Sequence, residues 1–184
     1  MVKIAYYVAA SADGLIAPAD GSLDWLSPFQ DTGEDHGYVE FYGGIDALIV
    51  GSRTYEQMLG FGEWPHHDRP VTVMSARALP IASDVITVSE EAPGDVVRSL
   101  SAAGHERIWL VGGGALAGSF DSASLIDDYI ISYLPVFLGA GVGLFGGRGG
   151  SQMLELVGTR SFSDGIVQCH YRTERGVSAG AGRE

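Results

Sequence analysis

Residues 108–116, with the sequence Ile-Trp-Leu-Val-Gly-Gly-Gly-Ala-Leu, decide the fold. Four apolar residues predict a buried strand, and the glycines that follow predict a tight turn into a helix. Such a turn places free backbone N–H groups at the positive end of the helix dipole, where phosphate binds readily. A glycine triplet also occurs in plain tight turns, so the phosphate interpretation depends on what the other strand ends carry.

A second strand-to-helix junction follows residues 47–50 and carries Gly51, Ser52, Arg53 and Thr54. The glycine allows a ligand to approach the backbone closely, and the hydroxyls and the guanidinium are suited to phosphate. An arginine here opposes the helix dipole, which indicates a role other than helix stability. The alternative is that Ser52 simply caps the helix.

A third junction follows the predicted strand at 71–74 and carries Ser75 and Arg77. Arg77 is either a phosphate ligand or a solvated surface charge. If the three strands are parallel, their carboxyl ends meet at one edge of the sheet. The sequence therefore predicts a dinucleotide that lies across this edge.

The hydrophobic pattern predicts one α/β domain over residues 1–175, with a disordered tail at 176–184. Strands that alternate with helices indicate a mainly parallel sheet, and the final two strands form an antiparallel hairpin around residues 163–165. Residues 11–29 read as a long loop. Strands are predicted at residues 2–10, 47–50, 71–74, 85–88, 108–111, 129–136, 153–162 and 166–172, and helices at 34–44, 52–59, 95–103 and 114–120.

The composition excludes several classes of protein. The chain has 184 residues, and its 46% hydrophobic and 18% charged residues exclude general disorder. A formal net charge of -12 argues against nucleic-acid and membrane-surface partners. The single cysteine, Cys169, precludes an intrachain disulfide, and we expect a cytoplasmic protein. No metal site is expected, because His66, His67 and Asp68 lack a third spaced ligand group.

Four stretches carry a resemblance to a known family. They are residues 8–14 (VAASADG) with 16–17 and 24–26, residues 46–56 (DALIVGSRTYE), residues 109–115 (WLVGGGA), and residues 134–141 (LPVFLGAG) with 144–145. In this order and spacing they resemble the dihydrofolate reductase-like superfamily. The chain is most similar to the C-terminal reductase domain of the bifunctional riboflavin-biosynthesis deaminase-reductase (RibD C-terminal domain), which uses 5-amino-6-(5-phosphoribosylamino)uracil.

The resemblance implies a three-layer fold and an NADPH-dependent reductase that transfers hydride to a small heterocyclic or imine- or carbonyl-like substrate. It also implies a cis peptide between the first two glycines of the 112–114 turn, and a homodimer with apolar contacts around residues 134–144. Combined with the strand-end analysis, it assigns the following cofactor-binding residues: Ala9, Ile16, Gly51, Ser52, Arg53, Thr54, Ser75, Arg77, Gly112, Gly113, Gly114, Ala115 and Leu116.

Two departures from the family pattern affect the expected ligands. Family members usually carry a basic residue where this chain has Ser52, so NADH is an alternative to NADPH. Before residue 50 the chain has only Lys3 as a basic residue, which weakens the prediction of a phosphorylated pyrimidine as substrate.

The resemblance places a candidate acid at Asp35, with Tyr38 beside it as a substrate contact. A buried Asp35 would donate a proton or bind an exocyclic amino group. The alternative is that Asp35 only interacts with the positive end of the helix dipole. The competing functional class is a non-catalytic nucleotide-binding module that keeps the fold without turnover.

Overall fold

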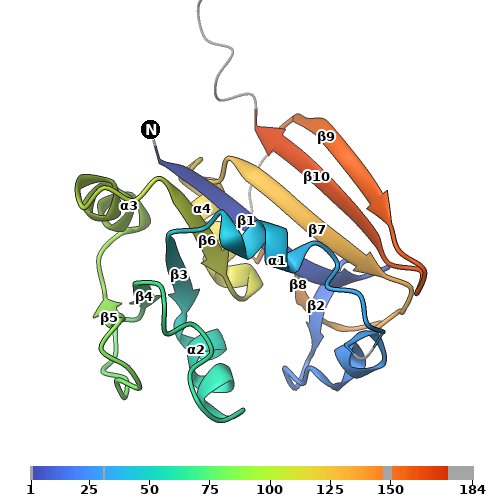
Figure 1. The fold of residues 1–184 in the computed structure, drawn as a ribbon, viewed down its shortest axis with the longest axis horizontal. Coiled ribbons are helices and arrows are strands. Elements are labelled where there is room, and N and C mark those ends of the chain that lie inside the picture. The colour runs from blue at the N-terminus through green and yellow to red at the C-terminus, as the bar shows by residue number, and fades with distance from the viewer. Residues whose placement is uncertain (1, 31, 147–150, 174–184) are drawn as a thin grey trace, which may run out of the picture.

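The core of the protein is an eight-stranded mixed sheet, seen in a computed structural model that describes residues 2–30, 32–146 and 151–173 (Figure 1). Its strand order is β5-β4-β3-β6-β1-β7-β10-β9. The first six strands in this order are parallel. Strand β10 is antiparallel to both of its neighbours, β7 and β9. The strands are β1 (Lys3–Ser11), β3 (Ala47–Gly51), β4 (Val71–Met74), β5 (Ile86–Ser89), β6 (Arg107–Val111), β7 (Asp128–Leu134), β9 (Leu154–Ser161) and β10 (Val167–Thr173).

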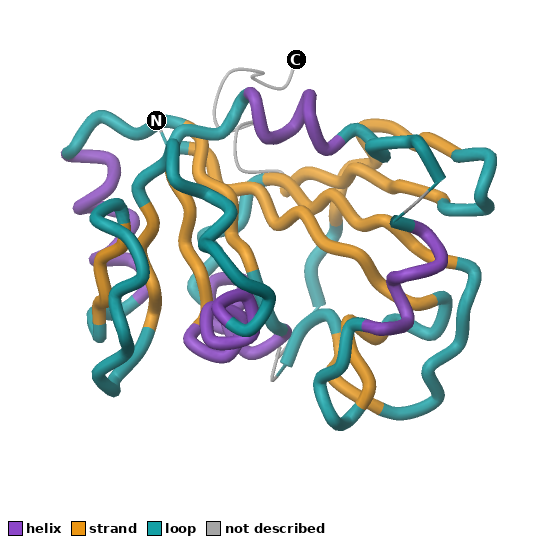
Figure 2. Tube along the Cα trace, turned by 60° about the horizontal axis from the view of Figure 1, so that its bottom comes forward, coloured by secondary structure: helices purple, strands orange, loops and turns teal. Residues whose placement is uncertain are grey.

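Helices cover both faces of the sheet, which confirms the predicted three layers (Figure 2). Helices α3 (Pro93–Ala102) and α4 (Gly114–Ser122) pack on one face through buried side chains such as Val96 and Phe120. Helices α1 (Tyr38–Gly43) and α2 (Ser52–Leu59) pack on the other face through Phe41 and Tyr55. The alternation of side chains along β1 divides the two cores, because Tyr6 packs in the first and Tyr7 in the second.

Residues 11–29 are not the plain loop that the sequence predicts. They contain β2 (Leu15–Pro18) and a 3₁₀ helix (Asp24–Phe29). Strand β2 pairs antiparallel with β8 (Gly141–Gly143), which lies more than a hundred residues later in the chain. The pairing was missed because neither short segment has the length or apolar content of a core strand.

The predicted helix at 34–44 begins four residues late, at Tyr38. Gly37 has φ 80°, a left-handed conformation that starts the helix there and leaves the preceding residues outside it. One side of this helix faces the core, since Phe41 is buried and Tyr38 and Tyr42 pack against the same cluster.

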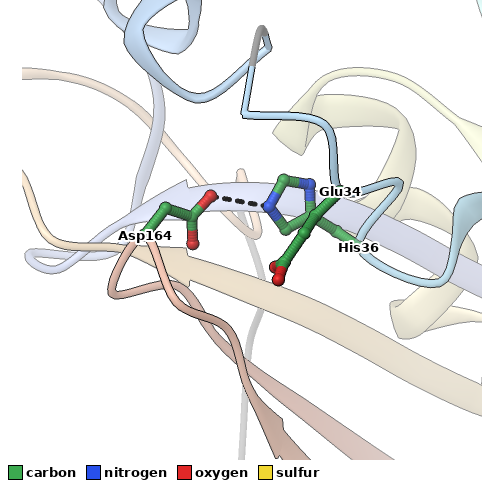
Figure 3. Close-up of side chains that lie close together, drawn as sticks. All are labelled: Glu34, His36 and Asp164. Atoms are coloured by element: carbon green, nitrogen blue, oxygen red, sulfur yellow. Dashed lines mark hydrogen bonds and ion pairs between the residues drawn. The ribbon is translucent and has the colours of Figure 1, made fainter.

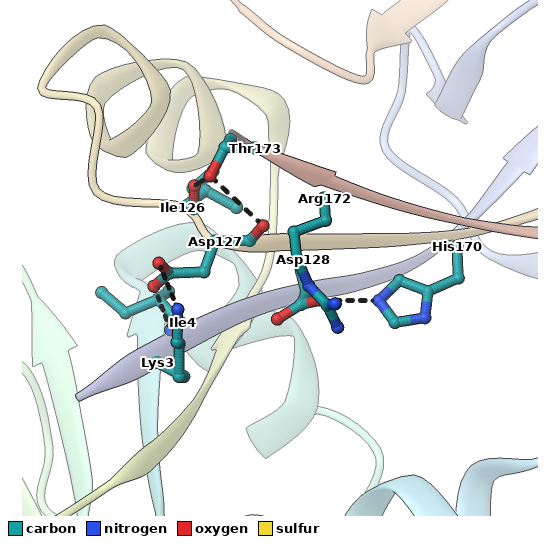
Figure 4. Close-up of polar contacts among 8 residues, drawn as sticks. All are labelled: Lys3, Ile4, Ile126, Asp127, Asp128, His170, Arg172 and Thr173. Atoms are coloured by element: carbon teal, nitrogen blue, oxygen red, sulfur yellow. Dashed lines mark hydrogen bonds and ion pairs between the residues drawn. The ribbon is translucent and has the colours of Figure 1, made fainter. Parts of the chain in front are cut away.

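Two adjacent aspartates fix the amino edge of the sheet (Figure 4). Asp127 accepts a hydrogen bond from the backbone amide of Ile4 at 3.0 Å. Asp128 accepts from Nε2 of His170 at 2.6 Å and from Nε of Arg172 at 3.1 Å. These contacts join β1, β7 and β10 at the edge opposite the three predicted phosphate-binding junctions.

In the described part of the chain, no helix has the length and apolar character needed to cross a membrane. The predicted tail at 176–184 lies outside the described residues, as does residue 175 at the end of the predicted domain.

Candidate functional site

The junctions after β3 and β6 lie side by side at the carboxyl edge of the sheet. The backbone amide of Gly113 donates a hydrogen bond to the Thr54 hydroxyl at 3.2 Å. Gly112 has φ 128°, and a Cβ added there would lie 2.7 Å from Thr54 Oγ1. Only glycine satisfies both the conformation and this close approach. The predicted turn is therefore a joint structure of two strand ends, and the peptide bond between Gly112 and Gly113 is trans rather than cis.

The outer side of this turn is open. A Cβ on Gly113 would meet no atom within 4 Å, although Gly113 is the N-cap residue of α4. The N-cap residues of α2 and α4 are Gly51 and Gly113, so neither helix has a side-chain cap. Ser52 is the first residue inside α2 and does not cap it, contrary to the alternative interpretation. Two helix N-termini with available amides lie next to each other, which suits an anionic ligand.

The inner side of the same turn is closed by backbone. The segment that follows β8 crosses the first turns of α4, and the amide of Gly146 donates to the carbonyl of Gly114 at 2.8 Å. A Cβ on Gly114 would lie 2.1 Å from the carbonyl oxygen of Gly143. A Cβ on Gly118 would be equally close to the carbonyl oxygen of Gly146, at 2.1 Å. These glycines serve packing, whereas Gly113 serves an open surface.

The two arginines predicted to bind phosphate differ in their surroundings. Arg77 forms a two-point ion pair with Glu56, with distances of 2.9 and 2.5 Å. This pairing lowers the pKa of Glu56. Arg53 is exposed, and its guanidinium has no hydrogen-bond or ionic partner among the described residues. Ser75 takes part in its own turn, because its hydroxyl donates to the carbonyl of Arg77 at 2.8 Å.

The ends of β1 and β7 are tied together by Asp13, whose role beyond its turn the sequence did not reveal. Its carboxylate accepts hydrogen bonds from the Ser11 hydroxyl and from the backbone amides of Gly139 and Leu138. The Ser11 and Gly139 hydrogen bonds contribute most to lowering the pKa of Asp13, which falls to about 2. Asp13 therefore holds the loop after β7 against the end of β1.

Two of the predicted cofactor-binding residues, Ala9 and Ile16, lie on strands near this link. Ala9 is on β1, where it pairs with Ser132 of β7. Ile16 is on β2 and packs half-buried against the core on the α3 and α4 face. Whether either residue contacts a cofactor stays a prediction.

Asp35 lies before α1 and caps it. Its carboxylate accepts hydrogen bonds from the amides of Gly37 at 3.1 Å and Val39 at 3.0 Å. The Val39 and Gly37 hydrogen bonds lower its pKa, and the side chain is exposed rather than buried. This environment favours a carboxylate that accepts hydrogen bonds over an acid that donates a proton. Its catalytic role stays a prediction.

Tyr38 belongs to a cluster of aromatic rings beneath α1. Its ring stacks on Tyr42 with centroids 5.6 Å apart and meets the edge of Trp109 at 5.8 Å. Tyr7 stacks on Phe41 at 4.3 Å in the same cluster. The half-buried Tyr38 thus presents an aromatic surface beside Tyr7, at the middle of β1.

Gln168 is a buried polar residue beside this cluster, and the sequence analysis did not single it out. Its side-chain amide donates to the Ser132 hydroxyl at 3.0 Å and to the carbonyl of His36 at 3.1 Å. It lines a groove of ≈ 390 Å³ between α1 and the β9–β10 hairpin, together with Tyr7 and Arg160. The groove includes none of the residues predicted to bind the cofactor.

Within the described residues, the side chains of His66, His67 and Asp68 are not grouped as metal ligands. His66 is buried beneath Tyr42, and burial lowers its pKa. The Tyr42 hydroxyl donates a hydrogen bond to the carboxylate of Asp68 at 2.6 Å.

Comparisons with known proteins identify the relatives of this chain. The RibD C-terminal domain family matches residues 2–168. An uncharacterized protein of Bacillus subtilis (strain 168), YwjB, is 35% identical over 170 residues, which span 92% of this chain and 97% of that protein. A protein from Shewanella sp. PV-4, provisionally assigned to riboflavin biosynthesis, has a crystal structure with a TM-score of 0.85 at 29% identity; the match covers 95% of this chain and 100% of that chain.

A bifunctional enzyme shows the same fold at lower identity. It is the diaminohydroxyphosphoribosylaminopyrimidine deaminase/5-amino-6-(5-phosphoribosylamino)uracil reductase of Thermotoga maritima, with a TM-score of 0.72 and 19% identity. The likeness covers 94% of this chain and 56% of that chain. The family match spans most of the chain, and the Bacillus subtilis relative aligns over nearly its full length. This protein therefore belongs to the RibD C-terminal domain family.

Proposed function

We propose that this protein is a reductase that binds a reduced nicotinamide dinucleotide across the carboxyl edge of its sheet. One observation carries the proposal. The starts of α2 and α4 lie together, joined by the hydrogen bond from Gly113 to Thr54, and the backbone at Gly113 is open to a ligand. The residues present fit a pyrophosphate, because glycine backbone and helix N-termini accept its charge without a blocking side chain.

Each part of the chain has a distinct task in this proposal. Amides in the first turns of α4 and α2 hold the phosphates, and Arg53 supplies a guanidinium that no described residue engages. Arg77 reads the adenosine end only by exchanging its Glu56 partner for a ligand phosphate. A competing carboxylate weakens selection for a 2′-phosphate, so we propose NADPH as the cofactor, with NADH accepted less well.

The proposed substrate is a small planar heterocycle. The Tyr38 ring and its aromatic neighbours beneath α1 suit stacking on a flat molecule. Asp35 has further lone pairs on its carboxylate, which would accept hydrogen bonds from exocyclic amino groups. When bound, the nicotinamide supplies the hydride, and the chain orients the two partners and excludes water.

The experiment combines binding with turnover. NADPH and NADH are titrated by calorimetry, and the loss of reduced-nicotinamide absorbance is then followed with a panel of pterins and aminopyrimidines. We expect saturable NADPH binding and turnover of at least one substrate. Absence of binding at millimolar NADPH would refute the proposal. Binding without turnover of any substrate would favour the non-catalytic module instead.

We further propose a homodimer in the cytoplasm. Leu134, in the region predicted to form the contact, is buried within the subunit, although Phe137 is exposed. Strand β9 is a more suitable contact, because it is an edge strand whose residues are all exposed. Leu156 and Val157 expose 56% and 42% of their surface on this strand, which is unfavourable in a monomer.

A further inference from the structure

Three side chains with metal-binding groups meet between the loop before α1 and the β9–β10 turn (Figure 3). They are Glu34, His36 and Asp164, and one ligand atom of each lies within 4.8 Å of the others. His36 Nε2 and Asp164 Oδ2 are 2.7 Å apart. Because 128 residues separate His36 from Asp164, no local spacing in the sequence could reveal the cluster.

His36 is held in place by contacts with its backbone carbonyl and its ring. The carbonyl of His36 accepts hydrogen bonds from the Tyr7 hydroxyl at 3.1 Å and from Gln168. The imidazole meets the edge of the Phe162 ring, with centroids 4.9 Å apart. The ring is therefore fixed by contacts that do not occupy Nε2, the atom directed at Asp164.

Asp164 is fixed as a carboxylate. Its second oxygen accepts a hydrogen bond from the amide of Ile166 at 3.2 Å, and its side chain is only 10% exposed. A carboxylate that is oriented by its neighbours in this way is a suitable metal ligand.

The charge at the cluster favours a cation. Glu34 accepts a hydrogen bond from the Ser163 hydroxyl at 3.2 Å, which holds it beside the turn that carries Asp164. Among the described residues, neither Glu34 nor Asp164 is paired with a lysine or arginine. Two carboxylates without a lysine or arginine partner therefore leave a local negative charge that a divalent ion would offset.

We propose that Glu34, His36 and Asp164 bind a divalent cation of the zinc class, with water at a fourth position. One imidazole nitrogen and two carboxylate oxygens form a mixed ligand set that suits Zn²⁺, whereas Mg²⁺ and Ca²⁺ prefer oxygen alone. Tetrahedral Zn²⁺ places its ligand atoms about 3.4 Å apart. The His36–Asp164 pair opens slightly to reach this spacing, and the exposed Glu34 moves inward.

Metal binding replaces the hydrogen bond between His36 and Asp164 with bonds from the three side chains to the metal. His36 then binds as the neutral tautomer that carries its one ring proton on Nδ1, so that the Nε2 lone pair faces the metal. The bound ion would link the loop before α1 to the β9–β10 turn. The three ligands come from these two segments alone, and none of them is among the residues proposed to bind the nicotinamide cofactor.

The test is a calorimetric titration of the full-length, chelator-treated protein with ZnCl₂. We expect one equivalent to bind, and we expect Asp164→Asn and His36→Gln to weaken binding by about 100-fold, since even outer-shell changes cost 10- to 100-fold. His67→Gln is the matched control, because His67 is exposed and lies outside the cluster. Equal binding by the wild type and both cluster variants would overturn the proposal, as would no binding.

A second variant guards against loss of fold. Glu34 is exposed, so Glu34→Gln should fold normally and still weaken Zn²⁺ binding. Co²⁺ should give the intense visible absorption of a tetrahedral complex, which Glu34→Gln should diminish and excess Mg²⁺ should leave unchanged. Displacement of Co²⁺ by Mg²⁺, or an unaltered spectrum in Glu34→Gln, would contradict the assigned ligand set.

Discussion

Replacing Gly113 with valine tests whether the open backbone at the start of α4 binds the pyrophosphate. A Cβ at this position meets no atom within 4 Å, and its φ of -64° suits any residue. The side chain would therefore fill only the space assigned to the ligand. Gly114→Ala is the matched comparison one residue later, where a Cβ would lie 2.1 Å from the carbonyl oxygen of Gly143.

The two substitutions should differ in the property that they damage. For Gly113→Val, an apolar N-cap costs about 1 kcal/mol, which lowers the melting temperature by about 2–4 °C. For Gly114→Ala, backbone overpacking and strain on the Gly146 hydrogen bond cost about 3 kcal/mol, or about 6–12 °C. The Gly113→Val variant should bind NADPH about 10- to 100-fold more weakly than the wild type, because it loses charge-assisted hydrogen bonds to the pyrophosphate.

Calorimetric titration with NADPH and differential scanning calorimetry measure both properties on the same samples. Gly113→Val should bind NADPH weakly and show only a small decrease in melting temperature. Gly114→Ala should show a large decrease in melting temperature but, below that temperature, should bind NADPH more tightly than Gly113→Val does. If Gly113→Val binds NADPH as the wild type does, the open amides are not the pyrophosphate site. A melting shift as large as that of Gly114→Ala would show that the turn is not open.

Leu156→Lys should convert the proposed dimer to a monomer, as measured by multi-angle light scattering. Phe61→Lys, at a loop residue that is 70% exposed, is the control and should leave the dimer intact. A wild type that is already monomeric would refute the proposed contact. Glu56→Gln should raise the ratio of NADPH to NADH affinity about tenfold by releasing Arg77, and an unchanged ratio in titrations would place Arg77 outside the 2′-phosphate site. Burial lowers the pKa of His66, so the unfolded chain takes up a proton that the folded chain does not. The free energy of unfolding should therefore fall as the pH drops below about 6.5, and urea melts of His66→Gln should show a shallower fall than the wild type; identical slopes would mean that His66 titrates alike in both states.

Central strands such as β3 and β6 could be predicted because each is a continuous apolar run that is buried on both faces. Strands β2 and β8 could not, because each is short and is defined only by its distant partner. The late start of α1 follows from the left-handed Gly37, since a helical apolar stripe does not by itself mark where a helix begins.

The candidate site divides in the same way. The turn at Gly112 was predictable because a run of glycines reports its own backbone requirement. The engagement of Arg77 by Glu56 and of Asp13 by Gly139 was not, because both depend on which side chains the fold brings together. A sequence indicates which residues are suited to a ligand, but competition from a neighbouring side chain is a property of the fold.

The backbone contacts of Gly114 with Gly143, and of Gly118 with Gly146, also limit how the protein can change. A larger residue at either helix position requires the facing segment to withdraw, and no single replacement in that segment creates room, because the obstructing atoms are main-chain carbonyls. Variants with altered cofactor preference are therefore accessible through Arg53 or Glu56, on the far side of the turn. In a library of random substitutions, the helix side of this contact should tolerate almost none, whereas neighbouring Gly113 should accept many without loss of expression.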